Sequence, residues 1–228
     1  SQTRAYTEAA FSYSKKLNDG KIHSDEYMSH QWAVNLNHFP LEKLFDESSE
    51  RAERSLEVKK PVSGKYSVII DAEVLLTLLS GYLTQLRAAH TYHSLPFIQQ
   101  GEEFIPGATG DLLTLTLDPS LAFGAHSTAL SSQGIAQRPL CIVSKNKVIS
   151  NITDQQYGEY LKLKPTTTHG NIVIPPGNLT HQELTQHSPQ VLEILQFSGL
   201  FADPHTGTFS SEIRLAKLYD REAQTVTY

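Results

Sequence analysis

Residues 63–86 read SGKYSVIIDAEVLLTLLSGYLTQL. The apolar, β-branched run at 65–70 follows turn residues and predicts a short buried strand. Asp71 is suited to cap a helix, because its carboxylate can accept hydrogen bonds from the N–H groups of the first turn. Apolar residues at helical spacings then form a wide face, made of Val74, Leu75, Leu78, Leu79, Tyr82, Leu83 and Leu86. The stretch therefore predicts a core helix from Asp71 to about Ala89.

The chain before this stretch predicts a hairpin followed by a linking helix. Residues 5–34 alternate in polarity around an Asn-Asp-Gly turn at 18–20, a pattern typical of two paired strands. Residues 40–56 begin at Pro40 and place apolar residues at helical spacings, with acids early and bases late. We expect residues 1–60 to form a unit apart from a main domain at 61–228.

The rest of the chain predicts short strands separated by turns and a few short helices. Strands are expected at 112–117, 139–143, 147–149, 171–174, 207–219 and 224–228. Short helices are expected at 154–161, 180–185 and 189–195, and residues 90–110 are expected to be irregular, with room for one short helix. The fold class that follows is α+β, with a strongly bent, mostly antiparallel sheet and a few helices packed on it.

Composition excludes several classes of protein. The chain has 228 residues, of which 39% are hydrophobic, and this is enough for a sizeable core. Its 19 Lys and Arg against 24 Asp and Glu give a net charge of −5, which argues against direct nucleic-acid binding. The longest apolar run, at 74–79, is far below the roughly 20 residues of a membrane span. The lone Cys141 excludes an internal disulfide and favours a cytoplasmic location. A start at Ser1 and a strand-like end indicate a fragment of a longer chain.

Ten histidines raise the question of a metal site. Zinc needs three or four converging ligands, usually marked by paired spacings. His90 and His93 form such a pair, and on a helix their rings would share a face. No HExxH pattern and no third ligand accompany them. We interpret the two as ordinary histidines.

Two other motifs resemble catalytic or binding loops without completing them. The Ser-Gly-Lys at 63–65 lacks the earlier glycine of a phosphate loop, since Lys59 stands there, and Tyr66 replaces the Ser or Thr after the lysine. It is interpreted as a turn before a strand. His126 beside Ser127 lacks an orienting acid, so this stretch is interpreted as a loop.

The carboxylates and the thiol also mark no site by spacing alone. Glu102 and Glu103 are adjacent in sequence and are expected to point apart into solvent, and the same holds for Asp71 and Glu73. Cys141 lies in a predicted strand, where a thiol behaves as a small hydrophobe. From spacing alone, we predict no catalytic residue and no cofactor site.

Several short strings, in order, resemble the TldD/PmbA family, known as modulators of DNA gyrase and as peptide-maturation proteases. PVSGKYSVI at 61–69 is similar to the family's "tGkYpVv" strand, and LTLDP at 115–119 to its "tvvDDP" strand end. Further resemblances are QGIAQR at 133–138 to "DeGvptrr", LCIVSKNKV at 140–148 to "tlvenGvl", and SG at 198–199 with DPHTGTFS at 203–210 to "GvNpvtGdFS". The resemblance extends from about Arg4 to the end and implies that residues 61–228 are the family's C-terminal domain, without its N-terminal domain.

The resemblance also locates the family's metal motif. In the metalloprotease branch, the helix after the "GkYpVv" strand carries HExxxH, whose histidines bind zinc and whose glutamate activates water. With Gly81 set against the motif's glycine, Thr77, Leu78 and Tyr82 stand where the His, Glu and second His would be. None of the three can replace them. The resemblance therefore implies the PmbA/TldE-like branch, with no catalytic, cofactor or metal-binding residues.

The function implied is that of a non-catalytic subunit of a cytoplasmic TldD/TldE-type protease acting on small unfolded peptides. Its expected partners are a TldD-like metalloprotease subunit and the peptide substrate, with a homodimer when that subunit is missing. Two alternatives stay open. The chain could be a peptidase with an unrecognised site, or a protein-binding modulator of DNA gyrase.

Overall fold

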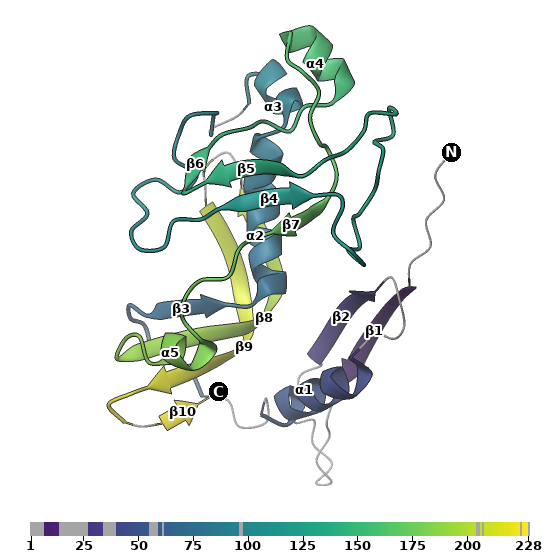
Figure 1. Cartoon of the computed structure of the whole chain (residues 1–228). Helices are drawn as coiled ribbons and strands as arrows, with labels where there is room; N and C mark the ends of the chain where they lie inside the picture. The colour runs from purple at the N-terminus through teal and green to yellow at the C-terminus, as the bar shows by residue number, and fades with distance from the viewer. Residues whose placement is uncertain are drawn as a thin grey trace.

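The computed structural model describes residues 7–13, 27–33, 40–54, 59–60, 62–95, 98–203, 206, 208–223 and 225–227. Helices and strands are interspersed along these residues, and the strands form three sheets (Figure 1). No helix in this part of the chain is long and apolar enough to cross a membrane. The α+β class predicted from sequence is confirmed.

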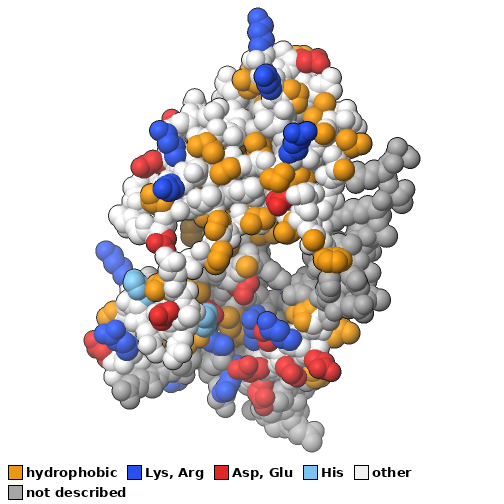
Figure 2. Space-filling view, in the orientation of Figure 1, with side chains coloured by type: hydrophobic (Ala, Val, Ile, Leu, Met, Phe, Trp, Pro, Cys, Tyr) orange, Lys and Arg blue, Asp and Glu red, His pale blue; other side chains and the backbone are white. Residues whose placement is uncertain are grey.

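The N-terminal unit is the predicted hairpin with its helix. Strands β1 (Thr7–Tyr13) and β2 (Tyr27–Ala33) pair antiparallel in one continuous register, while the predicted turn at 18–20 lies outside the described residues. Helix α1 (Leu41–Arg54) begins directly after Pro40 and lies against the hairpin (Figure 1). Its acidic first turn and basic last turn complement the helix dipole. Figure 2 shows charged side chains gathered over this helix.

The upper sheet of Figure 1 is fully antiparallel, in the order β6-β5-β4-β7. Its strands are β4 (Leu115–Asp118), β5 (Leu140–Ser144), β6 (Lys147–Val148) and β7 (Asn171–Val173). The predicted hairpin at 139–149 is confirmed. Its turn residues Lys145 and Asn146 have φ of 46° and 63°, the left-handed values of the turn that matches strand twist.

The lower sheet has the order β10-β9-β8-β3. Strands β3 (Ser67–Ile70), β8 (Gln190–Asp203), β9 (Thr208–Asp220) and β10 (Thr225–Thr227) form it. The pair β3–β8 is parallel, and the other pairs are antiparallel. The strands predicted to form one bent sheet are thus divided between separate sheets.

The helix predicted at 189–195 is wrong, because this segment begins strand β8. Its apolar residues come in pairs, which fits a helix face as well as a buried strand. Residues 191–194 pair with β3 on one edge and with β9 on the other. This pairing on both edges supplies hydrogen-bond partners for the backbone N–H and C=O groups of the segment, and Val191 and Ile194 are buried in it.

The predicted core helix ends earlier than its apolar pattern suggested. Helix α2 (Ala72–Gln85) stops before Arg87, which is extended and bridges to Ile152. Ile152 donates its N–H to Leu86 O at 2.9 Å and accepts from Ala88 N at 2.9 Å. A separate short helix α3 (Ala88–Tyr92) follows and overlaps the start of the irregular stretch expected at 90–110.

Two further short helices occur where they were predicted. Helix α4 (Gln155–Leu161) is capped by the Asp154 carboxylate, which accepts from Tyr157 N at 2.8 Å. Helix α5 (His181–Thr185) begins with a capping box between Thr180 and Glu183. In Figure 1, α4 lies beside α3 at one end of the molecule, and α5 lies beside the lower sheet.

The main core lies between α2 and the upper sheet. Leu79 and Leu83 are buried on one face of α2, and Leu86, directly after the helix, is buried with them. They belong to one cluster with sheet and loop residues Ile98, Phe104, Leu115, Leu117, Ile142, Val143, Val148 and Ile152. Figure 1 shows α2 crossing behind this sheet and reaching down to β3. The helix therefore joins the two four-stranded sheets.

Leu115 in β4 tests this core. Its side chain is fully buried, whereas Leu112, three residues earlier, is 47% exposed. We expect Leu115→Ala to lower the free energy of unfolding by about 2–5 kcal/mol, because it removes buried methyl groups and leaves a cavity. The matched control Leu112→Ala should cost under about 1 kcal/mol. Urea denaturation followed by circular dichroism measures both, and equal losses would contradict this description of the core.

Candidate functional site

The three positions that the resemblance sets against the family's metal motif lie along α2. Thr77 is exposed, and Leu78 and Tyr82 are half-buried. Zinc in proteins takes imidazole, thiolate or carboxylate ligands, and none of the three residues carries such a group. No group of three or more His, Cys, Asp and Glu that could hold a metal ion occurs among the residues that the structure describes. The residues present on this helix therefore do not fit a catalytic zinc.

The predicted histidine pair lies on α3, away from any third ligand among the described residues. His93 caps the C-terminal end of α3. Its ring meets Tyr92 edge-on at 5.1 Å between centroids, and its Nε2 lies 3.4 Å from the Tyr157 hydroxyl. His90 has a buried Nδ1 without a hydrogen-bond partner. His90 is half-buried and His93 is exposed, as expected of ordinary, partly exposed histidines.

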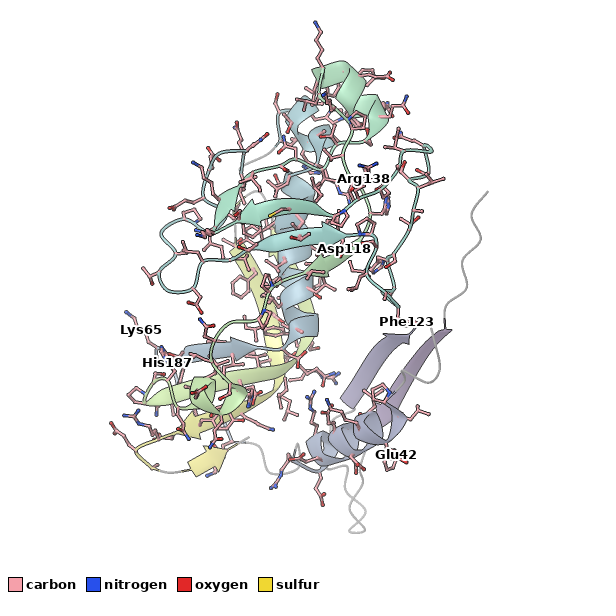
Figure 3. The ribbon with its side chains drawn as sticks, viewed as in Figure 1. Glu42, Lys65, Asp118, Phe123, Arg138 and His187 are labelled. Atoms are coloured by element: carbon pink, nitrogen blue, oxygen red, sulfur yellow. The ribbon has the colours of Figure 1, made fainter. Side chains whose placement is uncertain are left out.

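The stretch containing His126 and Ser127 is an ordered loop after β4. The buried Asn171 side chain holds it, accepting from His126 N at 2.9 Å and donating to Ser127 Oγ at 2.8 Å. The Ser127 hydroxyl in turn donates to Leu121 O at 2.6 Å. Figure 3 shows Asp118 at the end of β4 and Phe123 at the tip of this loop. The Ser127 hydroxyl thus donates its proton to a backbone carbonyl, whereas a nucleophilic serine needs a base to accept that proton.

The other sequence candidates lie apart from one another. Lys65 lines a cavity of about 400 Å³ at the start of β3 and β8, which also includes Asp220 and Glu222. Figure 3 shows Lys65 at this end of the lower sheet. Cys141 is half-buried in β5 and its thiol donates to Val143 O at 3.4 Å. The Glu73 side chain lies outside the described residues.

A larger cavity, of about 680 Å³, lies beside Tyr82. It is lined by Tyr82, Ile98, Glu102, Glu103, Phe104, Pro106 and Thr206. We call it the α2 groove. Three segments distant in sequence form it: α2, the stretch between α3 and β4, and the turn between β8 and β9. The Tyr82 ring meets Phe104 edge-on at 6.0 Å between centroids. The groove thus adjoins one of the three positions that the resemblance sets against the family's metal motif.

The wall of the α2 groove is fixed to the upper sheet by backbone hydrogen bonds. Val148 accepts from Gly101 N at 2.8 Å and donates to Glu102 O at 2.9 Å, and Phe104 N donates to Asn146 O at 2.7 Å. The buried Asn146 amide also clamps Ile105, accepting from its N–H at 2.9 Å and donating to its carbonyl at 2.8 Å. The segment is irregular, as expected, with turns, bends and one isolated bridge between Glu103 and Lys147, and these bonds hold it against β6.

The charged residues in the lining of the α2 groove are both acidic. Glu102 Oε2 accepts from Gln99 N at 2.8 Å, and Glu103 Oε2 accepts from Gly107 N at 3.0 Å. Within the described residues, no ion pair joins either carboxylate to a basic side chain. The sequence analysis expected these neighbours to point apart, yet both line one cavity. The two glutamates lie between Gly101 and Pro106. These turn-forming residues are the sequence signal that could have indicated an ordered loop here.

A second polar cluster ties α5 to the lower sheet. Glu193 of β8 contacts His181 Nε2 through Oε1 at 2.7 Å and accepts from the Tyr219 hydroxyl through Oε2 at 2.7 Å. Burial raises the pKa of Glu193. The hydrogen bonds from Tyr219 and His181, with the charges of His181 and Lys217, outweigh burial and hold that pKa below its ordinary value of 4.5. The ionised carboxylate therefore stabilises the folded state.

Glu193→Gln tests this link between charge and stability. Because the folded-state pKa is depressed, the contribution of Glu193 is complete above pH 4.5 and is lost as the pH falls through the folded-state pKa. Near neutral pH we expect the variant to be less stable by about 1 kcal/mol, since solvent partly screens the pair. The difference should shrink in acid. Denaturation curves at several pH values, with Glu159→Gln as an exposed control, would measure it. A difference independent of pH would contradict the assignment.

A family model described as "PmbA/TldA metallopeptidase C-terminal domain" matches residues 63–221. The match covers 159 of the 228 residues. No curated protein sequence matches the chain at a significant level.

Solved structures share the fold. A protein from Bacteroides thetaiotaomicron, described as a proposed modulator of DNA gyrase, has a TM-score of 0.77 at 20% identity, covering 96% of this chain and 48% of its own. A Thermotoga maritima protein with the same description has a TM-score of 0.72 at 19% identity, covering 85% and 46%. TldE from Thermococcus kodakarensis has a TM-score of 0.77 at 13% identity, covering 92% and 50%. The chain spans about half the length of these structures.

Proposed function

Because the chain belongs to the TldD/PmbA family, as the match over residues 63–221 shows, we propose that it is a non-catalytic, PmbA/TldE-like subunit of a peptide-processing protease. In this proposal a TldD-like subunit supplies the metal and hydrolyses small unfolded peptides. The present chain helps to enclose the peptide. The pairing is heterodimeric, with a homodimer when the TldD-like subunit is missing.

The observation that carries the proposal is the chemistry of α2. A metallopeptidase needs imidazole ligands for zinc and a carboxylate to activate the attacking water. Thr77, Leu78 and Tyr82 occupy the corresponding positions, and their hydroxyl, alkyl and phenol groups do not supply that set. The helix nevertheless keeps its place in the core through Leu79 and Leu83. We expect a subunit whose partner performs the hydrolysis to keep the fold and to lack the zinc-binding side chains.

Two features support a role in holding peptide. The α2 groove lies beside Tyr82 and has apolar as well as polar lining residues, as peptide-binding surfaces do. The sheets also offer strand edges, at which extended peptides can add by main-chain hydrogen bonds. The likeness to TldE from Thermococcus kodakarensis is consistent with the same branch.

The division of the chain into 1–60 and 61–228 stays a prediction, with the second part as the family's C-terminal domain. A cytoplasmic location also stays a prediction. The single cysteine, Cys141, favours it, because disulfide bonds are rare in proteins of a reducing compartment.

Metal content and activity of the purified chain and of its complex test the proposal. We expect the chain alone to contain little zinc and to leave unstructured peptides intact. Co-expressed with a TldD-like protein carrying HExxxH from the same host, it should co-purify with that protein, and the complex should hydrolyse peptides until a chelator removes the metal. Zinc analysis and peptide cleavage measured by mass spectrometry give the result. Stoichiometric zinc in the chain alone, lost in His90→Ala or His93→Ala, would overturn the assignment.

The same experiment separates the alternatives. Chelator-sensitive hydrolysis by the chain alone would favour a peptidase with an unrecognised site. A role in modulating DNA gyrase is suggested by the description of two matched structures. Recovery of gyrase in place of a TldD-like protein, in a pull-down from the host, would favour that role.

A further inference from the structure

We propose that the α2 groove binds an extended peptide at a lysine or arginine residue, with Glu102 and Glu103 holding the cation. This inference deepens the proposed function, since it names the class of peptide that the subunit would select. It rests on the lining of the groove and on its charge.

The size of the groove suits part of a peptide. Its volume of about 680 Å³ lies within the ~300–1,000 Å³ typical of small-ligand sites. Its two carboxylates belong to exposed residues, so a ligand reaches them from solvent. Thr206, which lies between β8 and β9, also lines the groove. A side chain with its flanking backbone can be accommodated, whereas a folded domain cannot.

The apolar lining residues fit the stem of a long basic side chain. Ile98 and Phe104 are 4% and 2% exposed and form the inner surface, with Tyr82 and Pro106 beside them. Lysine and arginine bury their methylene stems on such surfaces while the charged end stays at the polar side. The Tyr82 ring adds an electron-rich face with which a cation can interact.

The negative charge of the groove favours a positively charged ligand. Among the residues that the structure describes, its lining includes two carboxylates and no basic side chain. Each carboxylate has one oxygen placed by a backbone N–H, from Gln99 or Gly107. A fixed carboxylate loses little side-chain entropy on binding. Guanidinium and ammonium groups donate several hydrogen bonds to such oxygens. An acidic peptide would meet like charge and lose its hydration without compensation.

A metal ion is a weaker explanation of the same carboxylates. Divalent cations in proteins take six or more oxygen ligands, or four ligands in the case of zinc. Among the described residues, no third acidic, histidine or cysteine side chain joins Glu102 and Glu103 in a metal-holding group. An organic cation needs only hydrogen-bond acceptors and an apolar surface, and the groove offers both.

Binding of labelled peptides to the full chain tests the inference. The probes are a short, unstructured fluorescent peptide with central lysine and arginine residues, and the same peptide with glutamates in their place. We expect the basic peptide to bind and the acidic one to bind at least about tenfold more weakly, as the loss of a charge-assisted hydrogen bond predicts. Glu102→Gln and Glu103→Gln should each weaken the basic peptide by about tenfold. Fluorescence anisotropy gives the dissociation constants.

Glu159→Gln is the matched control, since Glu159 is exposed on α4 and does not line the groove. It should leave the affinity unchanged, and circular dichroism should show all variants folded. Equal binding of the acidic and basic peptides, or unchanged affinity in the double variant of Glu102 and Glu103, would overturn the inference. The chain is tested without a partner, so failure to pair with a TldD-like subunit would remove the proposed function and leave this result standing. If the chain pairs with that subunit but does not bind the basic peptide in the groove, this inference fails and the proposed function stands.

Discussion

The packing of α2 against the upper sheet is the interaction on which the rest of the structure depends. Leu79 and Leu83 of α2, with Leu86 directly after it, form one side of a buried cluster, and β4, β5 and β6 supply the other side. The same helix lies beside β8 in the lower sheet, so it fixes both sheets at once. A functional surface between the sheets can keep its geometry only because this helix is held by apolar contacts on its inner face.

The positions set against the family's metal motif are not separate from the packing of α2. Tyr82 packs against the buried cluster that contains Leu79 and Leu83, Leu78 is half-buried, and Thr77 is exposed. Tyr82 therefore contributes both to the core and to the lining of the α2 groove. The polar residues beside it come from the 98–107 segment, which Asn146 and Val148 attach to the sheet.

Local signals in the sequence predicted the elements whose pairing is local. The hairpin of β5 and β6, the capped helix α4 and the helix after Pro40 all have turn or capping residues next to an apolar pattern. The start of β8 was mistaken for a helix because its pairing with β3 joins segments far apart in sequence. The break after Gln85 depends in the same way on Ile152. The α2 groove was missed because its lining converges from three distant segments, and adjacent carboxylates alone indicate no cavity.

The long hairpin formed by β8 and β9 is bent by irregularities in its register. The register shifts between Ile194 and Gln196, again at Phe197, and between Ser198 and Leu200, and Gly199 has a φ of 71° that favours glycine. Bulges of this kind bend a strand and increase its twist. The start of β8 is fixed by its pairing with β3, and Thr206, beyond the end of β8, lines the groove. The bulges thus lie between the fixed start of β8 and the residue that this hairpin contributes to the groove, so a bend there bears on where that residue stands.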